Sequence, residues 1–316
     1  MITYATLKKS PRRFLSMTSL TVPEFEALLP TFTEESAKVH SLTHTRAGTP
    51  RRRKAGGGNK ARLATPEDQL LFILIYQKTY PLQTAHGLQF DLSQAQTNEW
   101  IHRLLPILER SLTGLKQMPE RDGAAFATSG VTPGVPTDLV IDGTERRRQR
   151  PKNPEKQREA YSGKKKTHTD KNVILINEHT ERVDYLSQTY CGKTHDKKIA
   201  DSEAIQYPPH ATLDQDTGFQ GYAPLGVLTF QPKKKPRGKD LGVADLFLNR
   251  LISSVRIRVE HVIASVKRCR IVKDVLRNTK EGFSDLVMRV ACALHNWRIC
   301  FRHPTPSQQL LFGYFR

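Results

Sequence analysis

The spacing of hydrophobic residues divides the chain into two parts. Before about residue 114, apolar residues recur three or four positions apart, as they do on one face of a helix. Capping residues support this pattern, because Thr65 followed by Pro66, and Ser93 with Gln96, are typical helix starts. The first part is therefore predicted to be helical. Its expected helices span residues 20–44, 65–78, 82–89 and 93–106, the last one kinked or ended by Pro106.

After about residue 136, the pattern changes to short apolar runs, which are typical of strands, between longer amphipathic segments. The expected strands span residues 139–142, 171–177, 182–187, 211–213 and 227–230. The expected helices span residues 196–205, 243–267 and 283–300. This second part is therefore predicted to combine a sheet with helices.

A segment rich in glycine and proline lies between the two parts and is the best candidate for a domain boundary. The chain is accordingly expected to hold five regions. They are an N-terminal helix and basic linker (1–63), a helix-turn-helix region (64–113), a linker (114–135), an α/β domain (136–300) and a C-terminal tail (301–316).

Positive charge is the main compositional signal. The 316 residues include 50 Lys and Arg against 31 Asp and Glu, a formal net charge of +19. Such an excess suits a polyanionic partner, because each neutralised phosphate releases counterions. Residues 46–62 are basic and hold no acid, so a contact with the DNA backbone is expected there, with an inert solvated linker as the alternative. The candidate contacts are Arg51, Arg52, Arg53 and Lys54.

The predicted helices at residues 82–89 and 93–106 have the length and tight turn of a helix-turn-helix. The second helix of this pair offers amide side chains on its exposed face, and amides make bidentate contacts with adenine. The candidates for this contact are Gln94, Gln96 and Asn98. An ordinary polar surface is the alternative, because any small helical bundle shows a similar pattern.

Three acidic residues stand out as candidates for chemistry. Asp142 ends an apolar run, Asp216 follows another short extended stretch, and Glu260 lies in a long amphipathic helix. Carboxylates are the ligands that Mg²⁺ prefers, and strand ends can bring two of them together with a helical third. Asp142 would bridge two ions, with Asp216 and Glu260 holding one ion each. Asp214 is a rival for the second position, although the glycine turn follows Asp216 directly.

The helix that carries Glu260 also places basic residues on one face. Arg256 is four residues before Glu260, and Lys267 is seven residues after it, so the three share that face. This arrangement suits a metal ligand beside a bound phosphate backbone, whereas the alternative is a surface ion pair. The apolar stripe expected to pack on the sheet comprises Leu251, Val255, Val259, Val262, Ile263 and Val266.

Taken together, these motifs resemble the DDE transposases of bacterial insertion sequences, in the group related to Harbinger elements. Asp142-Gly143-Thr144 is similar to the first motif of that family, and Asp216 to Gly221 is similar to its D-x-G-[YF]-x-G turn. Arg256, Glu260 and Lys267 match the helix pattern Y-x2-R-x3-E-x6-K, with Ser253 in place of the Tyr. The block around His195 and Asp196 also resembles the family, as structural or DNA-facing residues and not as ligands.

The resemblance implies an RNase H-like mixed sheet flanked by helices, preceded by an all-α helix-turn-helix DNA-binding region. It implies a transposase that binds the terminal inverted repeats of its element, cleaves them with two Mg²⁺ ions per site (Mn²⁺ is expected to substitute) and transfers strands. A homodimer or higher synaptic assembly is expected. A non-catalytic DNA-binding regulator derived from a transposase, and an RNase H-like nuclease without strand transfer, are the alternatives.

Two further basic clusters are candidates for DNA contact, with solvated loops as the alternative. Residues 146–171 hold eleven Lys and Arg, and residues 231–239 hold a second cluster; both are predicted to be loops. The named candidates are Lys164, Lys165, Lys166, Lys233, Lys234 and Lys235. The four cysteines show neither metal-site spacing nor a disulfide framework, and no apolar run is long enough for a membrane helix. A cytoplasmic, nucleoid-associated protein is therefore expected.

Overall fold

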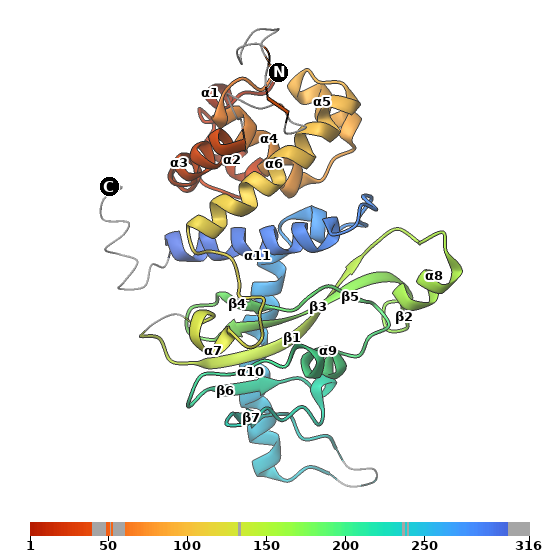
Figure 1. The fold of residues 1–316 in the computed structure, drawn as a ribbon. Helices are drawn as coiled ribbons and strands as arrows, with labels where there is room; N and C mark the ends of the chain where they lie inside the picture. The colour runs from red at the N-terminus through yellow and green to blue at the C-terminus, as the bar shows by residue number, and fades with distance from the viewer. Residues whose placement is uncertain are drawn as a thin grey trace. The chain divides into compact units, whose positions relative to one another are not determined.

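The computed structural model describes residues 1–39, 49–50, 52, 61–131, 134–235, 238 and 240–302 (Figure 1). Its contacts divide the chain into two compact units. The first unit comprises residues 1–117 with the short segment Cys269–Ile271, and the second comprises residues 118–268 with the described chain after Ile271. No helix of the described residues is long and apolar enough to cross a membrane.

The first unit is helical, as predicted. Its helices are α1 (Tyr4–Leu7), α2 (Pro11–Thr18), α3 (Val22–Val39), α4 (Pro66–Thr79), α5 (Gln83–Phe90) and α6 (Gln94–Gly114). Of these, α1 and α2 were not predicted. Pro106 does not end the fourth expected helix, because α6 continues to Gly114. Buried residues on both sides of the proline, such as Leu105 and Ile107, hold the helix in the core despite one missing hydrogen bond.

Helix α4 forms the centre of this unit. Its residues Leu70 to Gln77 are all buried, as expected for a helix that is surrounded by others. Thr65 caps it by accepting a hydrogen bond from the backbone of Asp68, and Pro66 occupies the first turn. Helix α6 begins with the predicted capping box of Ser93 and Gln96. These caps fix where the two helices start.

The second unit is built on a mixed sheet. Its strands are β1 (Asp138–Arg147), β2 (Tyr161–Ser162), β3 (Thr167–Asn177), β4 (Val183–Leu186), β5 (Tyr190–Cys191), β6 (Thr212–Gln215) and β7 (Leu228–Phe230). Strands β1, β3 and β4 are antiparallel neighbours, whereas β6 pairs in parallel with β1 and β7 in parallel with β6. The order β4-β3-β1-β6-β7 is that of an RNase H-like sheet, so this prediction is confirmed.

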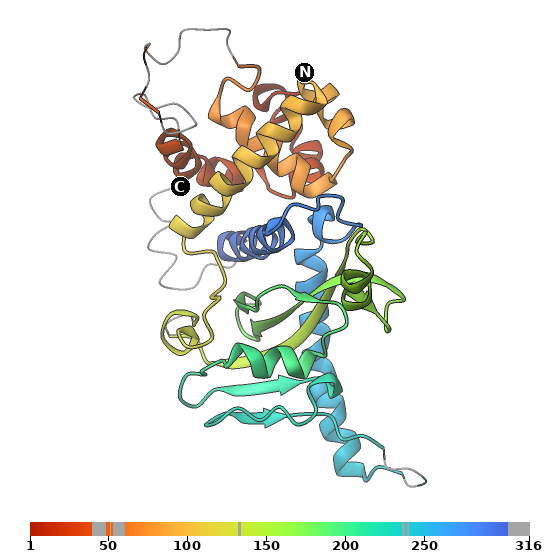
Figure 2. The ribbon, with the colours of Figure 1, turned by 45° about the vertical axis from the view of Figure 1, so that its right-hand side comes forward.

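Helices flank the sheet (Figures 1 and 2). They are α7 (Phe126–Ser129), α8 (Pro154–Ala160), α9 (Asp196–Glu203), α10 (Val243–Val266) and α11 (Phe283–Arg302). The 3₁₀ turn η1 (Thr217–Phe219) also belongs to this unit, whereas η2 (Arg270–Val272) begins in the short segment assigned to the first unit. On one face, Ile199 and Ala200 of α9 pack against Leu139 and Ile141 of β1. Helices α10 and α11 pack against β1, β4 and each other. Alternate residues of β1 therefore meet different partners.

Three details differ from the sequence predictions. Strand β1 continues five residues beyond Asp142, because β3 pairs with it as far as Arg147, so Asp142 lies within a strand and not at its end. The segment 146–171 is not a loop, since it contains α8, β2 and the start of β3. The apolar stripe of α10 is buried at Val259, Val262 and Val266, but Leu251 is 50% exposed.

Candidate active site

Asp142 lies within β1, and Asp216 lies next to it, directly after the end of β6. The parallel register of β1 and β6 pairs Ile141 with Gln215, so each aspartate follows one member of this pair. Each carboxylate also accepts a hydrogen bond from the next backbone N–H: Asp142 from Gly143 at 2.7 Å, and Asp216 from Thr217 at 2.6 Å. Sheet pairing and these local bonds together hold the two carboxylates at adjacent positions.

The electrostatics of Asp142 reflect this arrangement. Burial raises its pKa from the ordinary value to about 6; the hydrogen bond from Gly143 and the charge of Arg256 oppose the rise, while the charges of Asp216 and Asp196 add to it. The site therefore concentrates negative charge that is partly removed from water. Hard oxygen donors gathered in this way suit a divalent cation such as Mg²⁺.

Helix α10 brings basic residues to the same region. A guanidinium nitrogen of Arg256 lies 3.3 Å from Oδ2 of Asp216. Lys267 donates to the backbone carbonyl of Glu145 at 3.2 Å. Burial lowers the pKa of Lys267, and the nearby charge of Lys165 lowers it further, whereas Asp142 opposes the shift. Lys267 thus lies within electrostatic reach of Lys165, which comes from a distant segment, and of Asp142.

Glu260 occupies a different position from the two aspartates. It lies on the face of α10 that carries Arg256 and Lys267, but its side chain is exposed. Within the described part of the chain, no three His, Cys, Asp or Glu side chains are grouped closely enough to hold a metal ion. The structure therefore brings Asp142 and Asp216 together and leaves Glu260 nearby on the helix, outside a closed ligand set.

Asp214, the alternative second ligand, lies on β6 beside the first residues of β1. Its register partner is Val140, two residues before Asp142. Burial raises the pKa of Asp214 to about 6, and the charges of Glu178 and Asp138 add to the rise. Its acidic neighbours are thus those at the start of β1, whereas Asp216 is the strand neighbour that acts on Asp142.

Asp196 also belongs to the surroundings of the site. Its carboxylate lies against Gly143, where a Cβ atom would be 2.6 Å from Oδ1, and within 3.4 Å of a Cβ at Gly218. Asp196 was expected to be a structural or DNA-facing residue, and its position beside the two predicted ligands was not predicted. The available signal was the pair of glycines, each one or two residues after a predicted ligand.

The predicted DNA-reading residues lie at the start of α6, next to α5. Oε1 of Gln83 accepts hydrogen bonds from Gln94 at 2.6 Å and from Asn98 at 3.3 Å. The side chain of Gln96 accepts from the backbone of Ser93, so it serves the helix cap. Gln94 and Gln96 are exposed, and Asn98 is partly exposed. The three side chains are placed together, but each already has a partner.

A close contact between α5 and α6 sets the geometry of this pair. A Cβ at Gly87 would lie 2.4 Å from the carbonyl oxygen of Leu92 and 2.7 Å from Oγ1 of Thr97. Thr97 is buried. Asp91 turns the chain between the helices in a left-handed conformation, with φ of 55°. Glycine at position 87 is therefore what allows the tight helix-turn-helix packing.

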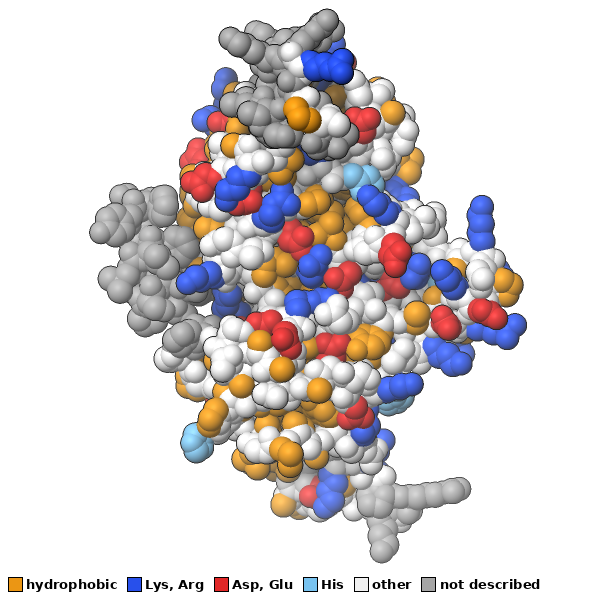
Figure 3. Space-filling view, in the orientation of Figure 1, with side chains coloured by type: hydrophobic (Ala, Val, Ile, Leu, Met, Phe, Trp, Pro, Cys, Tyr) orange, Lys and Arg blue, Asp and Glu red, His pale blue; other side chains and the backbone are white. Residues whose placement is uncertain are grey.

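The basic clusters differ in how their side chains are engaged. Lys164, Lys165 and Lys166 are exposed in the turn between β2 and β3, and Figure 3 shows Lys and Arg side chains, with a few acids, over the region of α8 and β2. Three other lysines are exposed but have partners: Lys233 contacts Asp245, Lys234 contacts Gln220 and Lys235 contacts Asp240. Arg52 is exposed, whereas Arg51, Arg53 and Lys54 lie outside the described residues.

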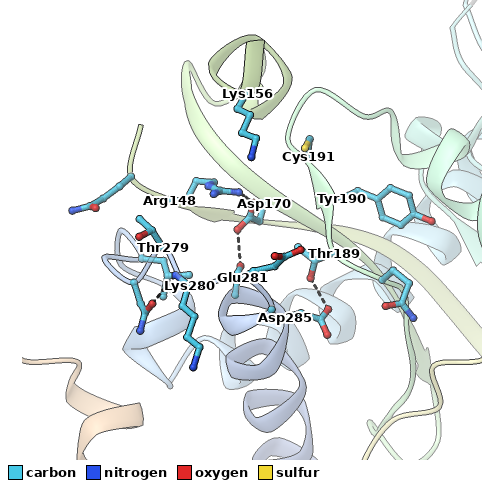
Figure 4. A pocket seen from close by; sticks show the side chains of 16 residues that line it. Arg148, Lys156, Asp170, Thr189, Tyr190, Cys191, Thr279, Lys280, Glu281 and Asp285 are labelled. Carbon is cyan, nitrogen blue, oxygen red and sulfur yellow. Dashed lines mark hydrogen bonds and ion pairs between the residues drawn. The ribbon is translucent and has the colours of Figure 1, made fainter. Parts of the chain in front are cut away.

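A cavity of about 760 Å³ lies beside the start of α11 (Figure 4). Asp142, Asp216 and Glu260 are not part of its lining. Two of its carboxylates are already engaged: Asp170 with Arg148 at 2.7 Å, and Asp285 with Thr189 at 2.7 Å. Its lining is of mixed charge and indicates no particular ligand.

Family models match two parts of the chain. The model described as DDE superfamily endonuclease matches residues 141–296, and the helix-turn-helix of DDE superfamily endonuclease matches residues 61–114. A probable transposase for insertion sequence element IS702 from Microchaete diplosiphon is 27% identical over 240 residues, which cover 75% of this chain and 82% of that protein. A cryo-EM structure of the piggyBac transposase synaptic complex with hairpin DNA aligns with 93% of this chain and 75% of that one, at 10% identity and a TM-score of 0.40.

These matches define the chain as a DDE superfamily endonuclease with a helix-turn-helix DNA-binding region ahead of an RNase H-like domain. Within that superfamily, it belongs to the DDE transposases of insertion sequences. The family predicted from the three acidic motifs is thereby confirmed. Endonucleases of this superfamily typically use divalent metal ions, and Asp142 and Asp216 supply suitable oxygen donors.

Proposed function

We propose that this protein binds the terminal inverted repeats of its own insertion sequence, cleaves DNA strands at those ends and joins them to target DNA. The observation that carries this proposal is the adjacent placement of Asp142, within β1, and Asp216, directly after β6, with Arg256 of α10 beside Asp216. Residues 136–300 would form the catalytic domain. The helix-turn-helix region at 64–113 would recognise the element ends.

The metal ligands in this proposal are Asp142, Asp216 and Glu260. Two Mg²⁺ ions, for which Mn²⁺ would substitute, would supply the Lewis acidity that activates the attacking water or hydroxyl and the leaving 3′ oxygen. Asp142 is largely ionised at neutral pH, because its pKa is about 6. Arg256 holds the carboxylate of Asp216 through its ion pair, and is placed to contact a phosphate when that pair opens.

The DNA would be held by basic side chains beside the acidic pair. Lys267 and Lys165 lie within electrostatic reach of each other, and their mutual repulsion would be relieved by a bound phosphate. The basic segment at Arg51 to Lys54 and the cluster at Lys233 to Lys235 would contribute further backbone contacts. Gln94, Gln96 and Asn98 would read bases from the start of α6.

Joining two element ends requires two active sites to act together, so a homodimer or larger synaptic assembly is part of the proposal. The place of action would be the DNA of the nucleoid in the cytoplasm.

A salt-dependent affinity for DNA is expected from the formal charge of +19, since added ions compete with the contacts between basic side chains and phosphates.

The deciding experiment incubates the purified protein with DNA that carries its element ends, a target plasmid and Mg²⁺. Cleavage at the element ends followed by joining to the plasmid is expected, with no cleavage in EDTA. Nicking without joining would favour a nuclease, and binding without nicking would favour a regulator derived from a transposase. Replacing the end sequence with an unrelated duplex of equal length is the control for recognition of the repeat.

A further inference from the structure

Two glycines next to the predicted ligands face the same carboxylate. A Cβ at Gly143, directly after Asp142, would lie 2.6 Å from Oδ1 of Asp196. A Cβ at Gly218, two residues after Asp216, would lie 3.4 Å from Oδ2 of the same residue. The Asp196 carboxylate therefore fits between the two segments that carry the acidic pair, in space that a larger side chain at position 143 would occupy.

Strand alternation places this carboxylate behind Asp142. Leu139 and Ile141 of β1 face the core that contains Ile199 of α9. Gly143 continues this alternation and meets Asp196 at the start of the same helix, whereas the side chain of Asp142 belongs to the opposite face. Asp196 thus supports the acidic pair from the α9 side and does not share its face.

A buried lysine anchors the carboxylate. Nζ of Lys171 lies 3.2 Å from Oδ1 of Asp196 and 3.5 Å from Oε1 of Glu145. The same ammonium group donates to the backbone carbonyl of Thr194 at 2.9 Å. The side chain of Lys171 is only 9% exposed, so its charge needs these partners. An acid in the first turn of a helix favours that helix in any case, but this general role requires neither a buried lysine nor two facing glycines.

We propose that Asp196 is a positioning residue that fixes the spacing of Asp142 and Asp216, with Lys171 holding it in place. The proposal rests on the proposed function for its effect on cleavage. The packing of the Asp196 carboxylate against the backbone after Asp142 and Asp216 does not depend on that function.

The geometric part is tested by thermal unfolding of paired variants. Gly143 has an ordinary backbone conformation, so Gly143→Ala should lower Tm through its contact with Asp196 and not through strain at φ. In the double variant Gly143→Ala/Asp196→Ala the clash is removed. Its decrease in Tm should therefore be smaller than the sum of the decreases in the two single variants. Gly163→Ala is the matched control, because nothing lies within 4 Å of a Cβ there, and its effect should add to that of Asp196→Ala.

The positioning part is tested with Asp196→Asn, which keeps the shape and removes the charge. Loss of a group that orients metal ligands typically reduces activity or metal affinity by about 10- to 100-fold. The Mg²⁺ concentration for half-maximal cleavage should rise by about that factor, while affinity for element-end DNA in EDTA stays unchanged. Asp196→Glu should not restore the Mg²⁺ dependence of the wild type, because the space beside Gly143 is too small for a longer side chain. Asp201→Asn, in the exposed pair of the same helix with Lys197, should match the wild type.

The outcomes separate this proposal from the proposed function. A wild-type protein that never cleaves DNA would overturn the function and the positioning role, while the Tm coupling would still decide the geometry. Normal cleavage and Mg²⁺ dependence in Asp196→Asn would overturn the positioning role alone. Additive Tm changes for Gly143→Ala and Asp196→Ala would contradict the packing on which it depends.

Discussion

The start of α6 and the centre of the sheet both carry predicted functional residues, but they hold them in opposite ways. At α6, neutral amides bond to one another, with Gln83 accepting from Gln94 and Asn98. At the sheet, burial raises the pKa of Asp142, and the like charges of Asp216 and Asp196 add to the rise. Exchanging one amide hydrogen bond for another changes the free energy little. Keeping a partly buried carboxylate charged is costly, and the cost persists until a cation arrives.

The comparison indicates that the two regions are prepared for different partners. The amides at α6 already have hydrogen-bond partners without DNA, so recognition there would replace existing bonds by new ones. The carboxylates keep an excess of negative charge even with Arg256 nearby, so a divalent cation would relieve a destabilising arrangement. Substitutions should therefore affect cleavage and DNA binding separately.

The largest expected effect is on cleavage. Asp142→Ala, Asp216→Ala and Glu260→Ala should each reduce cleavage of element ends by at least about 100-fold, because each removes a charged group at the reacting phosphate. Affinity for the ends should stay within about twofold, since the helix-turn-helix is untouched. Gel assays of nicking and of binding measure the two quantities. Asp214→Ala is the control, and full cleavage by Asp216→Ala with loss in Asp214→Ala would reverse the choice of second ligand.

The second-largest expected effect is on the packing of α5 against α6. Gly87→Ala would place a methyl group 2.4 Å from the carbonyl oxygen of Leu92, so α5 and α6 must move apart. We expect a loss of about 1–3 kcal/mol in the free energy of unfolding, together with weaker binding of element ends. Alanine otherwise favours a helix over glycine, so a more stable variant would contradict the close contact. Gly114→Ala, with its nearest neighbour at 3.4 Å, is the matched control.

A smaller effect concerns pH. The folded pKa of Asp142 is about 6, above its unfolded value, so the native state binds the extra proton between about pH 4 and pH 6. Its contribution to stability is fully present below the unfolded pKa and is lost as pH rises through 6. Asp142→Asn should therefore be more stable than the wild type at pH 7.5, by no more than about 3 kcal/mol, and equal to it near pH 4. Denaturant unfolding without divalent ions at both pH values measures this, and a constant difference would contradict it.

The smallest effects are in the salt dependence of DNA affinity. Changing Lys164, Lys165 and Lys166 to Ala should reduce the slope of log K against log salt by up to about 0.9 for each phosphate that is no longer neutralised. The same change at Lys233, Lys234 and Lys235 should reduce it less, because those lysines already contact protein groups.

Neutralising Arg51 to Lys54 tests the basic segment before α4 in the same way. A flatter salt dependence is expected if this segment contacts the DNA backbone. Equilibrium binding measured from low to moderate salt provides the slope for each variant. A slope identical to that of the wild type would make the segment an inert linker.

Much of the fold could be predicted from local patterns. Helices α4 and α6 were found because Thr65 and Ser93 mark their starts, and the central strands because their apolar runs are continuous. The full length of β1 was not found, because Gly143 and Glu145 are not typical strand residues and only pairing with β3 extends the strand. Helix α8 was missed because the basic residues around it indicated a loop, although Asn153 followed by Pro154 is the same kind of helix start as Thr65 followed by Pro66.

The candidate site was predicted in part. The closeness of Asp142 and Asp216 was expected because each follows a short apolar run, and the register of β1 with β6 brings them together even though β1 continues beyond Asp142. The place of Asp196 could not be derived in this way, because it depends on how α9 crosses the sheet and on Lys171, which lies on β3 opposite Glu145. Such contacts arise from tertiary packing and leave no local periodicity.

The continuation of β1 past Asp142 restricts where related proteins can gain or lose residues. Pairing with β3 runs on both sides of the aspartate, from Leu139 to Arg147. Because side chains alternate between faces, inserting or deleting one residue between Leu139 and Asp142 would turn the carboxylate toward α9. Length changes are therefore expected to accumulate in the projecting segment around α8, while the stretch before Asp142 keeps its residue count.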